Sequence, residues 1–381
     1  MKAEVAFTPL LTAARALKPY TTPPRWHTTT RLLHLHSSGH TLTLSATTGE
    51  ETAQVDLPGA IADGHVGITP DTLVKALTAM RPKGKAAATA TLTLLAEPDR
   101  LYLSANGAPT VGLDTDTGPA GPADPPPMPS PTPVTAGPVG DWCDLVSKVA
   151  WAAGGEAGRP ELAVVRLRRD HPGTVLMVEA TDAYRAHRGC GGEPTGDPVD
   201  ARMPAAAVQR ATKLLTACDP HGGLRIDVDD ERLRWQTSTV RVYARTRGQP
   251  FPNLEKLRED VCSEANIRFT VDRPALLAAL DTAAALAATT RRGTLRVEPA
   301  SGGAGVDVTV YADSGAVLHR TPVPIGGPTR PAQALTFKPA FARQAIAFLD
   351  GPTVAVAATI GRLAVYLHAG DRHAIVMQTA A

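Results

Sequence analysis

Hydrophobic and polar residues alternate along this chain with two different periods. Segments of period two, such as Leu233 and Trp235 between Arg232 and Arg234, predict half-buried β-strands. Elsewhere apolar residues recur every three or four positions, which predicts amphipathic helices with one buried face. The expected helices cover residues 8–20, 70–81, 141–153, 204–218, 272–288 and 338–349. The mixture indicates an α+β protein.

The order of these elements repeats about every 132 residues. Three junctions between a strand and a helix carry a proline at the helix start, where proline loses no hydrogen bond. These prolines are Pro70, Pro204 and Pro339. Three hairpin strands begin with an Arg-Leu pair, at Arg100, Arg232 and Arg362. We therefore expect three tandem, pseudo-equivalent domains, each with two helices packed on antiparallel sheets.

Two connecting segments separate the copies. Residues 118–138 hold nine prolines in 21 positions, a composition too stiff and too poor in amide donors for regular structure. The expected organisation is domain one at 1–117, a Pro-rich linker at 118–138, domain two at 139–250, a linker at 251–263 and domain three at 264–381.

Composition narrows the classes of function. The chain is 43% hydrophobic and 20% charged, which excludes disorder throughout, and its net charge of +2 excludes a binder held to polyanions by bulk charge. The four cysteines form no zinc motif, and their wide spacing fits reduced thiols. Because neither a signal peptide nor a membrane-spanning stretch is found, we expect a cytoplasmic protein.

The charges are unevenly distributed. The six expected helices carry ten Lys and Arg against five Asp and Glu, and three of these acids, Asp71, Asp141 and Asp272, lie at helix starts, where the helix dipole favours them. Two interpretations stay open at this point. The helices have ordinary solvated faces, or they form a surface that meets DNA phosphates without reading bases.

Local motifs connect the threefold repeat to a known family. Val178–Arg185 reads V-E-A-T-D-A-Y-R, Arg159–Leu162 reads R-P-E-L, Phe251–Asn253 reads F-P-N and Val271–Leu277 reads V-D-R-P-A-L-L. Each resembles a segment of the β sliding clamp of bacterial DNA polymerase III, and together with the repeat the resemblance covers the whole chain.

This resemblance implies the DNA-clamp (processivity) fold and a mechanism. In the family, two subunits join head to tail into a ring whose helices surround duplex DNA and whose sheets lie outside. The dimer contact would then involve Val111 in domain one and Leu286 and Ala287 in domain three. Residues near the helices would contact DNA without sequence preference; the candidates are Arg25, Lys75, Arg81, Lys83, Lys148, Arg210 and Lys213.

The family also implies partners. A clamp is a non-catalytic subunit of the polymerase holoenzyme, without cofactor or metal, that tethers the polymerase III catalytic subunit to DNA. The clamp loader, other polymerases and repair proteins insert a short hydrophobic peptide into one groove. Carried over residue by residue, the groove is lined by Leu162, Thr181, Ala183, Tyr184, Arg185, Pro252, Leu257, Ala364, Ile375, Val376 and Met377, with Val376 and Met377 expected as its floor.

The chain departs from the family at this groove. It ends Met377-Gln-Thr-Ala-Ala381 where the family usually ends M-P-x-R-L, and Ala186 stands where a Leu is usual. Both changes remove apolar volume. They leave a second form of the same function open, an accessory clamp that serves a mobile element or resists inhibitors aimed at the ordinary clamp.

An enzyme or a metal protein is the alternative of another class. His34, His36 and His40 invite a metal site, but they also fit the wet face of a strand, and no carboxylate or Cys nearby completes a set. Asp182 beside Tyr184 and Arg185 fits a strand-end turn better than a catalytic site. The sequence holds no nucleophile elbow, Walker loop or HExxH motif, so we expect no catalysis.

Overall fold

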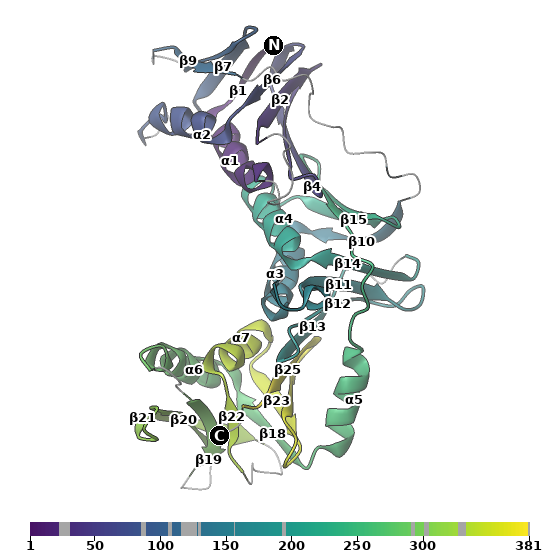
Figure 1. Cartoon of the computed structure of the whole chain (residues 1–381), viewed down its shortest axis with the longest axis vertical. Coiled ribbons are helices and arrows are strands. Elements are labelled where there is room, and N and C mark those ends of the chain that lie inside the picture. Colours follow the sequence, from purple (N-terminus) through teal and green to yellow (C-terminus); the bar gives the residue numbers. More distant parts are fainter. Residues whose placement is uncertain are drawn as a thin grey trace. The chain divides into compact units, whose positions relative to one another are not determined.

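A computed structural model describes residues 1–22, 31–84, 89–105, 109–115, 128, 131–155, 157–192, 196–290, 294–300, 305–326 and 333–379 (Figure 1). Contacts divide the chain into two compact units. The first unit comprises Met1–Asp144, Arg169–Leu176 and Gly192–Arg247, and the second comprises Leu145–Arg168, Met177–Gly191 and Gly248–Ala381.

The first repeat begins with a strand and a helix, continues with a run of strands, and ends with a second helix and three strands. A short 3-10 helix, Lys18–Thr21, follows the first helix. The elements are β1 (Lys2–Ala6), α1 (Phe7–Leu17), β2 (Leu33–Ser38), β3 (Thr41–Thr47), β4 (Glu51–Pro58), β5 (Ala60–Ala62), β6 (Gly64–Ile68), α2 (Pro70–Ala79), β7 (Thr91–Ala96), β8 (Arg100–Ala105) and β9 (Val111–Asp114).

The second repeat has the same order of elements, with four strands between its helices in place of five. Two 3-10 turns, Ala150–Ala152 and Pro160–Leu162, stand between its first helix and its second strand. The elements are β10 (Thr132–Pro138), α3 (Val139–Val149), β11 (Val164–Arg169), β12 (Leu176–Thr181), β13 (Arg185–Gly191), β14 (Val199–Pro204), α4 (Ala205–Cys218), β15 (Gly223–Val228), β16 (Arg232–Gln236) and β17 (Val240–Arg245).

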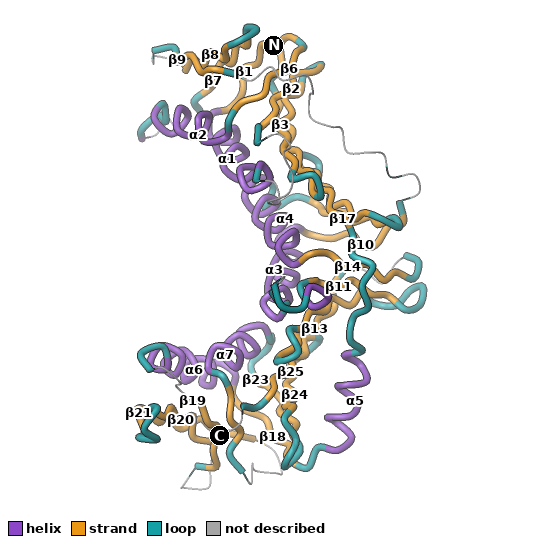
Figure 2. The backbone as a smooth tube through the Cα atoms, viewed as in Figure 1, coloured by secondary structure: helices purple, strands orange, loops and turns teal. Residues whose placement is uncertain are grey.

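The third repeat follows an additional helix, α5 (Leu254–Glu264). Its two helices α6 and α7 pack on each other beside the strands of the same repeat (Figure 2). The elements are β18 (Ile267–Asp272), α6 (Arg273–Ala287), β19 (Thr294–Pro299), β20 (Gly305–Tyr311), β21 (Val317–Gly326), β22 (Leu335–Phe337), α7 (Pro339–Phe348), β23 (Thr353–Ala358), β24 (Ala364–Ala369) and β25 (Arg372–Met377). The threefold repeat is confirmed.

The sheets continue from one repeat into the next. In the first unit, one sheet has the order β5-β1-β7-β8-β9, and the other runs β10-β15-β16-β17-β4-β3-β2-β6. The second joins two repeats, because β17 pairs antiparallel with β4, with Val242 opposite Ala53. In the second unit, β13 pairs in the same way with β25, with Ala186 opposite Ile375. The strands of neighbouring repeats therefore share their hydrogen-bond ladders.

The six expected helices all form. Each begins within two residues of its expected start and ends within four residues of its expected end. Both expected connecting segments contain regular structure, which the Pro-rich composition of the first was expected to prevent. The final seven residues of the expected Pro-rich linker form β10, which pairs with β15 through a register shift near Pro133. Because β10 is the end strand of its sheet, prolines are tolerated there. The expected linker at 251–263 contains α5.

Candidate functional site

The turn between β12 and β13 presents one exposed aromatic side chain. Ala183 has a φ of +72°, in the left-handed region, and the Thr181 hydroxyl accepts a hydrogen bond from the Ala183 amide at 3.1 Å and donates one to the Arg185 carbonyl at 2.7 Å. The Asp182 carboxylate accepts from the amides of Tyr184 and Arg185, both at 2.9 Å. These bonds hold the turn so that Tyr184 stays 60% exposed.

Arg185 is fixed by several partners at once. Its Nε donates to Asp182 Oδ2 at 3.1 Å, its Nη1 donates to the Gln344 side chain, and its guanidinium lies 4.2 Å from the centre of the Phe341 ring. Burial lowers the pKa of the Arg185 guanidinium, and the Asp182 carboxylate opposes this. Arg185 therefore connects the β12–β13 turn to α7 through its contacts with Asp182, Gln344 and Phe341.

Lys338, the residue before α7, lies at the same corner. Its ammonium is 5.3 Å from the centre of the Tyr184 ring and 5.2 Å from that of Phe341. Sequence reasoning did not name Lys338, Phe341 and Gln344, which contact Tyr184 and Arg185. The only sequence signal was the Lys338-Pro339 pair, which indicates where a helix starts. It does not indicate that this helix contacts Arg185, more than 150 positions earlier in the chain.

The expected groove residues are divided between two faces of the sheet. On β24 and β25, Ala364 lies opposite Met377 and Val365 opposite Val376. Since successive side chains point to opposite faces, Ile375 and Met377 share one face and Val376 lies on the other. Val376 lines an apolar core cavity of the third repeat and is fully buried. Val376 and Met377 therefore do not form one floor, which differs from the sequence-based expectation.

Helix α5 covers the face that carries Ile375. Its Leu254 and Val261 are buried in one cluster with Ala186, Ala357, Ala364, Tyr366 and Ile375, and Leu257 and Met377 pack against that cluster. Ala364 and Ile375, expected as groove wall, are thus buried beneath the chain's own helix. Leu162 and Thr181 are buried as well, whereas Ala183 and Pro252 are exposed.

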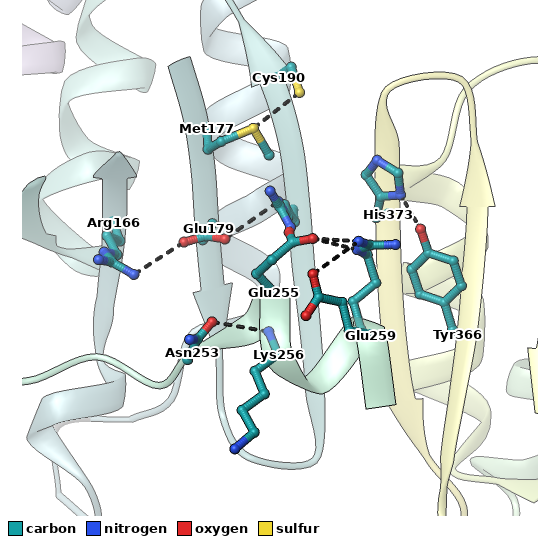
Figure 3. A network of polar contacts seen from close by, with 12 residues as sticks. Arg166, Met177, Glu179, Cys190, Asn253, Glu255, Lys256, Glu259, Tyr366 and His373 are labelled. Atoms are coloured by element: carbon teal, nitrogen blue, oxygen red, sulfur yellow. Dashed lines mark hydrogen bonds and ion pairs between the residues drawn. The ribbon is translucent and has the colours of Figure 1, made fainter. Parts of the chain in front are cut away.

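Ion pairs hold α5 at its amino-terminal end (Figure 3). Asn253 caps the helix by accepting a hydrogen bond from the Lys256 amide at 3.1 Å. Glu255 pairs with Arg188 of β13 and, at 2.9 Å, with Arg258 one turn later. Arg188 also lies 3.5 Å from the buried carboxylate of Glu179. The helix is therefore anchored by charge as well as by apolar contact.

The residues expected to contact DNA differ in their surroundings. Lys75, Arg81, Lys83 and Lys213 are exposed, and Lys148 is partly buried. Arg210 instead donates to Glu51 of β4, from Nε to Oε2 at 2.9 Å and also from Nη2 to Oε1. Arg25 lies outside the described residues. Exposed cations on α2 and α4 thus remain available for phosphate, while the Arg210 guanidinium is occupied by a carboxylate.

The residues expected at a dimer contact lie in an end strand of a sheet and at the end of a helix. Val111 is in β9, the end strand of its sheet, and Leu286 and Ala287 are partly buried at the end of α6. In the same repeat as α6, Val317 and Leu318 of β21 are 49% and 42% exposed. Sequence reasoning named neither residue, because pattern alone does not show that only the far end of β21, Ile325 and Gly326, pairs with β18.

The histidines considered for a metal site lie on β2 and in the turn that follows it. In that part of the chain, no group of three or more His, Cys, Asp and Glu is arranged to hold a metal ion. His34 stacks on His65, with 3.0 Å between ring nitrogens, and burial lowers the pKa of His34 to about 4. None of the described helices is both long and apolar enough to cross a membrane.

Comparison with known proteins identifies the fold. No family model matches the chain, and no curated protein matches its sequence. Solved structures do match it over the full length of both chains. A putative DNA polymerase III β subunit from Eubacterium rectale has a TM-score of 0.82 at 12% identity, and the β chain from Streptococcus pneumoniae has 0.82 at 15%. A sliding clamp from Pseudomonas aeruginosa, bound to griselimycin, has 0.81 at 15%. Over its whole length, the chain has the fold of bacterial DNA polymerase III β subunits.

Proposed function

We propose that this chain is a DNA sliding clamp, a processivity factor that encircles duplex DNA as a head-to-tail homodimer in the cytoplasm. It catalyses no reaction and tethers the replicative polymerase and other proteins that carry clamp-binding peptides. The observation that carries the proposal is the match of fold along all 381 residues to sliding-clamp structures.

Two features of the chain support the proposal. Ladders that continue between repeats, at β17–β4 and β13–β25, suit a protein whose sheets must form one outer layer. Exposed Lys75 and Lys213 lie on helices α2 and α4, as expected of helices that touch phosphates loosely. Loose contacts suit a clamp, because the ring is held on DNA by topology rather than by affinity.

Sedimentation of the full chain tests the dimer. At micromolar concentration it should give about twice the 39.8 kDa mass of one chain. Leu286→Asp should favour monomers, because it places an unpaired charge in the contact. Leu363→Asp, at an exposed leucine outside that contact, should leave the mass unchanged. A strictly monomeric or trimeric native protein would contradict the proposal.

A second form of the function, an accessory clamp with an altered peptide groove, rests on Ala186, which stands where the family usually has a Leu. Helix α5 and Ala186 fill the face where Ala364 and Ile375 were expected to receive a ligand. The residues after Met377 also differ from the family's usual P-x-R-L, which removes one buried aliphatic side chain. A peptide that binds ordinary clamps should therefore bind here about ten to one hundred times more weakly. Calorimetry against this protein and an ordinary clamp measures the difference, and equal affinities would leave plain replicative processivity.

A further inference from the structure

A cation, Lys338, and a phenol, Tyr184, lie at the corner between the β12–β13 turn and the start of α7. Among the described residues, neither the Lys338 ammonium nor the Tyr184 hydroxyl has a hydrogen-bond acceptor or a carboxylate partner. Lys338 is exposed and Tyr184 is 60% exposed. The Lys338 ammonium lies over the Tyr184 and Phe341 rings, so two exposed donors belong to the same corner.

The other charges at this corner are already matched. Asp182 pairs with Arg185, which also binds Gln344, and Arg343 of α7 pairs with Asp281. Lys338 and Arg185 carry two positive charges and Asp182 carries one negative charge. Because Arg185 is paired with Asp182, the remaining positive charge is that of Lys338. One excess charge is too little for a phosphate backbone, which needs several cations for appreciable affinity. It suffices to select a single carboxylate.

The corner adjoins the expected groove. The Met377 amide donates to the Tyr184 carbonyl at 2.8 Å, and beyond it the Thr379 amide donates to the carbonyl of Thr336, two residues before Lys338. A peptide that lies along the expected groove and passes Met377 would meet the Tyr184 ring, which offers apolar contact, and then the two donors. The residues beneath α5 are buried, whereas Tyr184 is exposed, so we expect an occupant to make its contacts at this corner.

We propose that the Lys338–Tyr184 corner binds a carboxylate of the partner peptide, so that this clamp prefers acidic clamp-binding segments. The inference rests on the proposed function and specifies the chemistry of its partners. The carboxylate is either an Asp or Glu side chain or the free carboxyl terminus of the peptide, since both present the same acceptor oxygens. Lys338 is then the residue that sets specificity, with Tyr184 as a second donor.

Fluorescence anisotropy with the full-length protein tests the proposal. The probe is a short, labelled, amidated peptide of leucine, phenylalanine and serine, in which one Asp is moved through every position, with Asn at the same position as its match. A further version has a free carboxyl terminus. One position, or the free terminus, should bind about two- to fivefold more tightly than its neutral match, as expected for an exposed ion pair.

The preference should disappear in Lys338→Gln and pass to a Lys-containing peptide in Lys338→Glu. Lys256→Gln, at an exposed lysine of α5, should keep it. If no acidic version is preferred by a protein that sediments as a dimer, the inference is wrong and the clamp proposal stands. A preference that survives Lys338→Gln overturns it too. So does a loss of duplex DNA binding in Lys338→Gln with peptide selectivity unchanged, because the lysine would then serve DNA.

Discussion

Arg210 of α4 and Glu51 of β4 form a two-point ion pair across the first unit, with Nε donating to Oε2 at 2.9 Å. The Glu51 side chain is only 7% exposed, and its charge helps to raise the pKa of the buried Tyr20 hydroxyl, which desolvation raises first. A carboxylate so placed depends on its partner. Arg210 is therefore a structural residue before it is a DNA contact.

Removing Arg210 should cost stability, because Glu51 would remain buried without its partner. We expect Arg210→Ala to lower the free energy of unfolding by about 3–5 kcal/mol. Lys213→Ala, at an exposed lysine one turn along the same helix, should change it by less than about 0.5 kcal/mol. Urea unfolding followed by circular dichroism measures both, and equal small effects would show that the pair is not maintained.

Duplex DNA binding should depend on the exposed cations instead. The native protein should bind linear duplex weakly, without sequence preference, and with a steep dependence on salt. Reversing Lys75 and Lys213 to Glu should weaken binding and lower the slope of log affinity against log salt by about one for each lost phosphate contact. Anisotropy with labelled duplexes at several salt concentrations measures that slope. A slope unchanged by both reversals would remove these lysines from the DNA surface.

Ala186 and Leu254 should be energetically coupled, because they share the cluster beneath α5. Ala186→Leu should overpack that cluster and cost about 1–3 kcal/mol, and Leu254→Ala alone should cost about 2–5 kcal/mol by leaving a cavity. In the double variant the added methyl groups can enter that cavity, so the combined cost should be smaller than the sum. Strictly additive costs, from urea unfolding of the four proteins, would mean that the two side chains do not compete for space.

Stability should fall in mild acid. His187 is fully buried, stacks on Phe348 at 4.6 Å between ring centres and bonds to the Lys148 carbonyl. Burial lowers the pKa of His187 to about 4, an effect that the Lys148 carbonyl opposes and Arg185 reinforces. Because the unfolded chain takes up the proton near pH 6.5 and the folded chain only near pH 4, stability is highest above pH 6.5 and declines toward pH 4.

Each such proton contributes a slope of up to about 1.4 kcal/mol per pH unit within that window. Replacing His187 by Gln should reduce the slope of unfolding free energy against pH by the contribution of one proton. Urea unfolding between pH 6.5 and pH 5 measures this slope. Replacing the exposed His171 by Gln is the matched control and should leave the slope as it is. An unchanged slope in the His187 variant would show that the ring takes up its proton over the same pH range in the folded and the unfolded protein.

The repeat, its helices and the fold were predictable because they depend on periodic patterns within short windows. Helix α5 was missed although its signals are present. Asn253 caps it and Leu254, Leu257 and Val261 follow at helical spacing, but the preceding Phe251-Pro-Asn motif indicated a connector. Strand β10 was missed because proline-rich composition hides an end strand that needs few amide donors.

The candidate site was less predictable, since its contacts join residues far apart in the chain. The pattern gave Arg210 an exposed, basic helix face, and nothing in the sequence places Glu51 against it. Likewise, Val376 and Met377 were grouped by family position, although neighbours on a strand point to opposite faces. Residue type and spacing predict which element a side chain belongs to, and packing decides what it meets.

Topological linkage to DNA is the central claim, and it can be measured directly. Native dimers are diluted to dissociate, concentrated again with a singly nicked circular plasmid, and closed by chemical cross-linking. After a high-salt wash, the account predicts that cross-linked protein stays with the circle and is released when a restriction enzyme linearises it. Equal retention on circular and linear DNA, or no retention on the circle although cross-linked dimers have formed, would contradict a ring around the duplex.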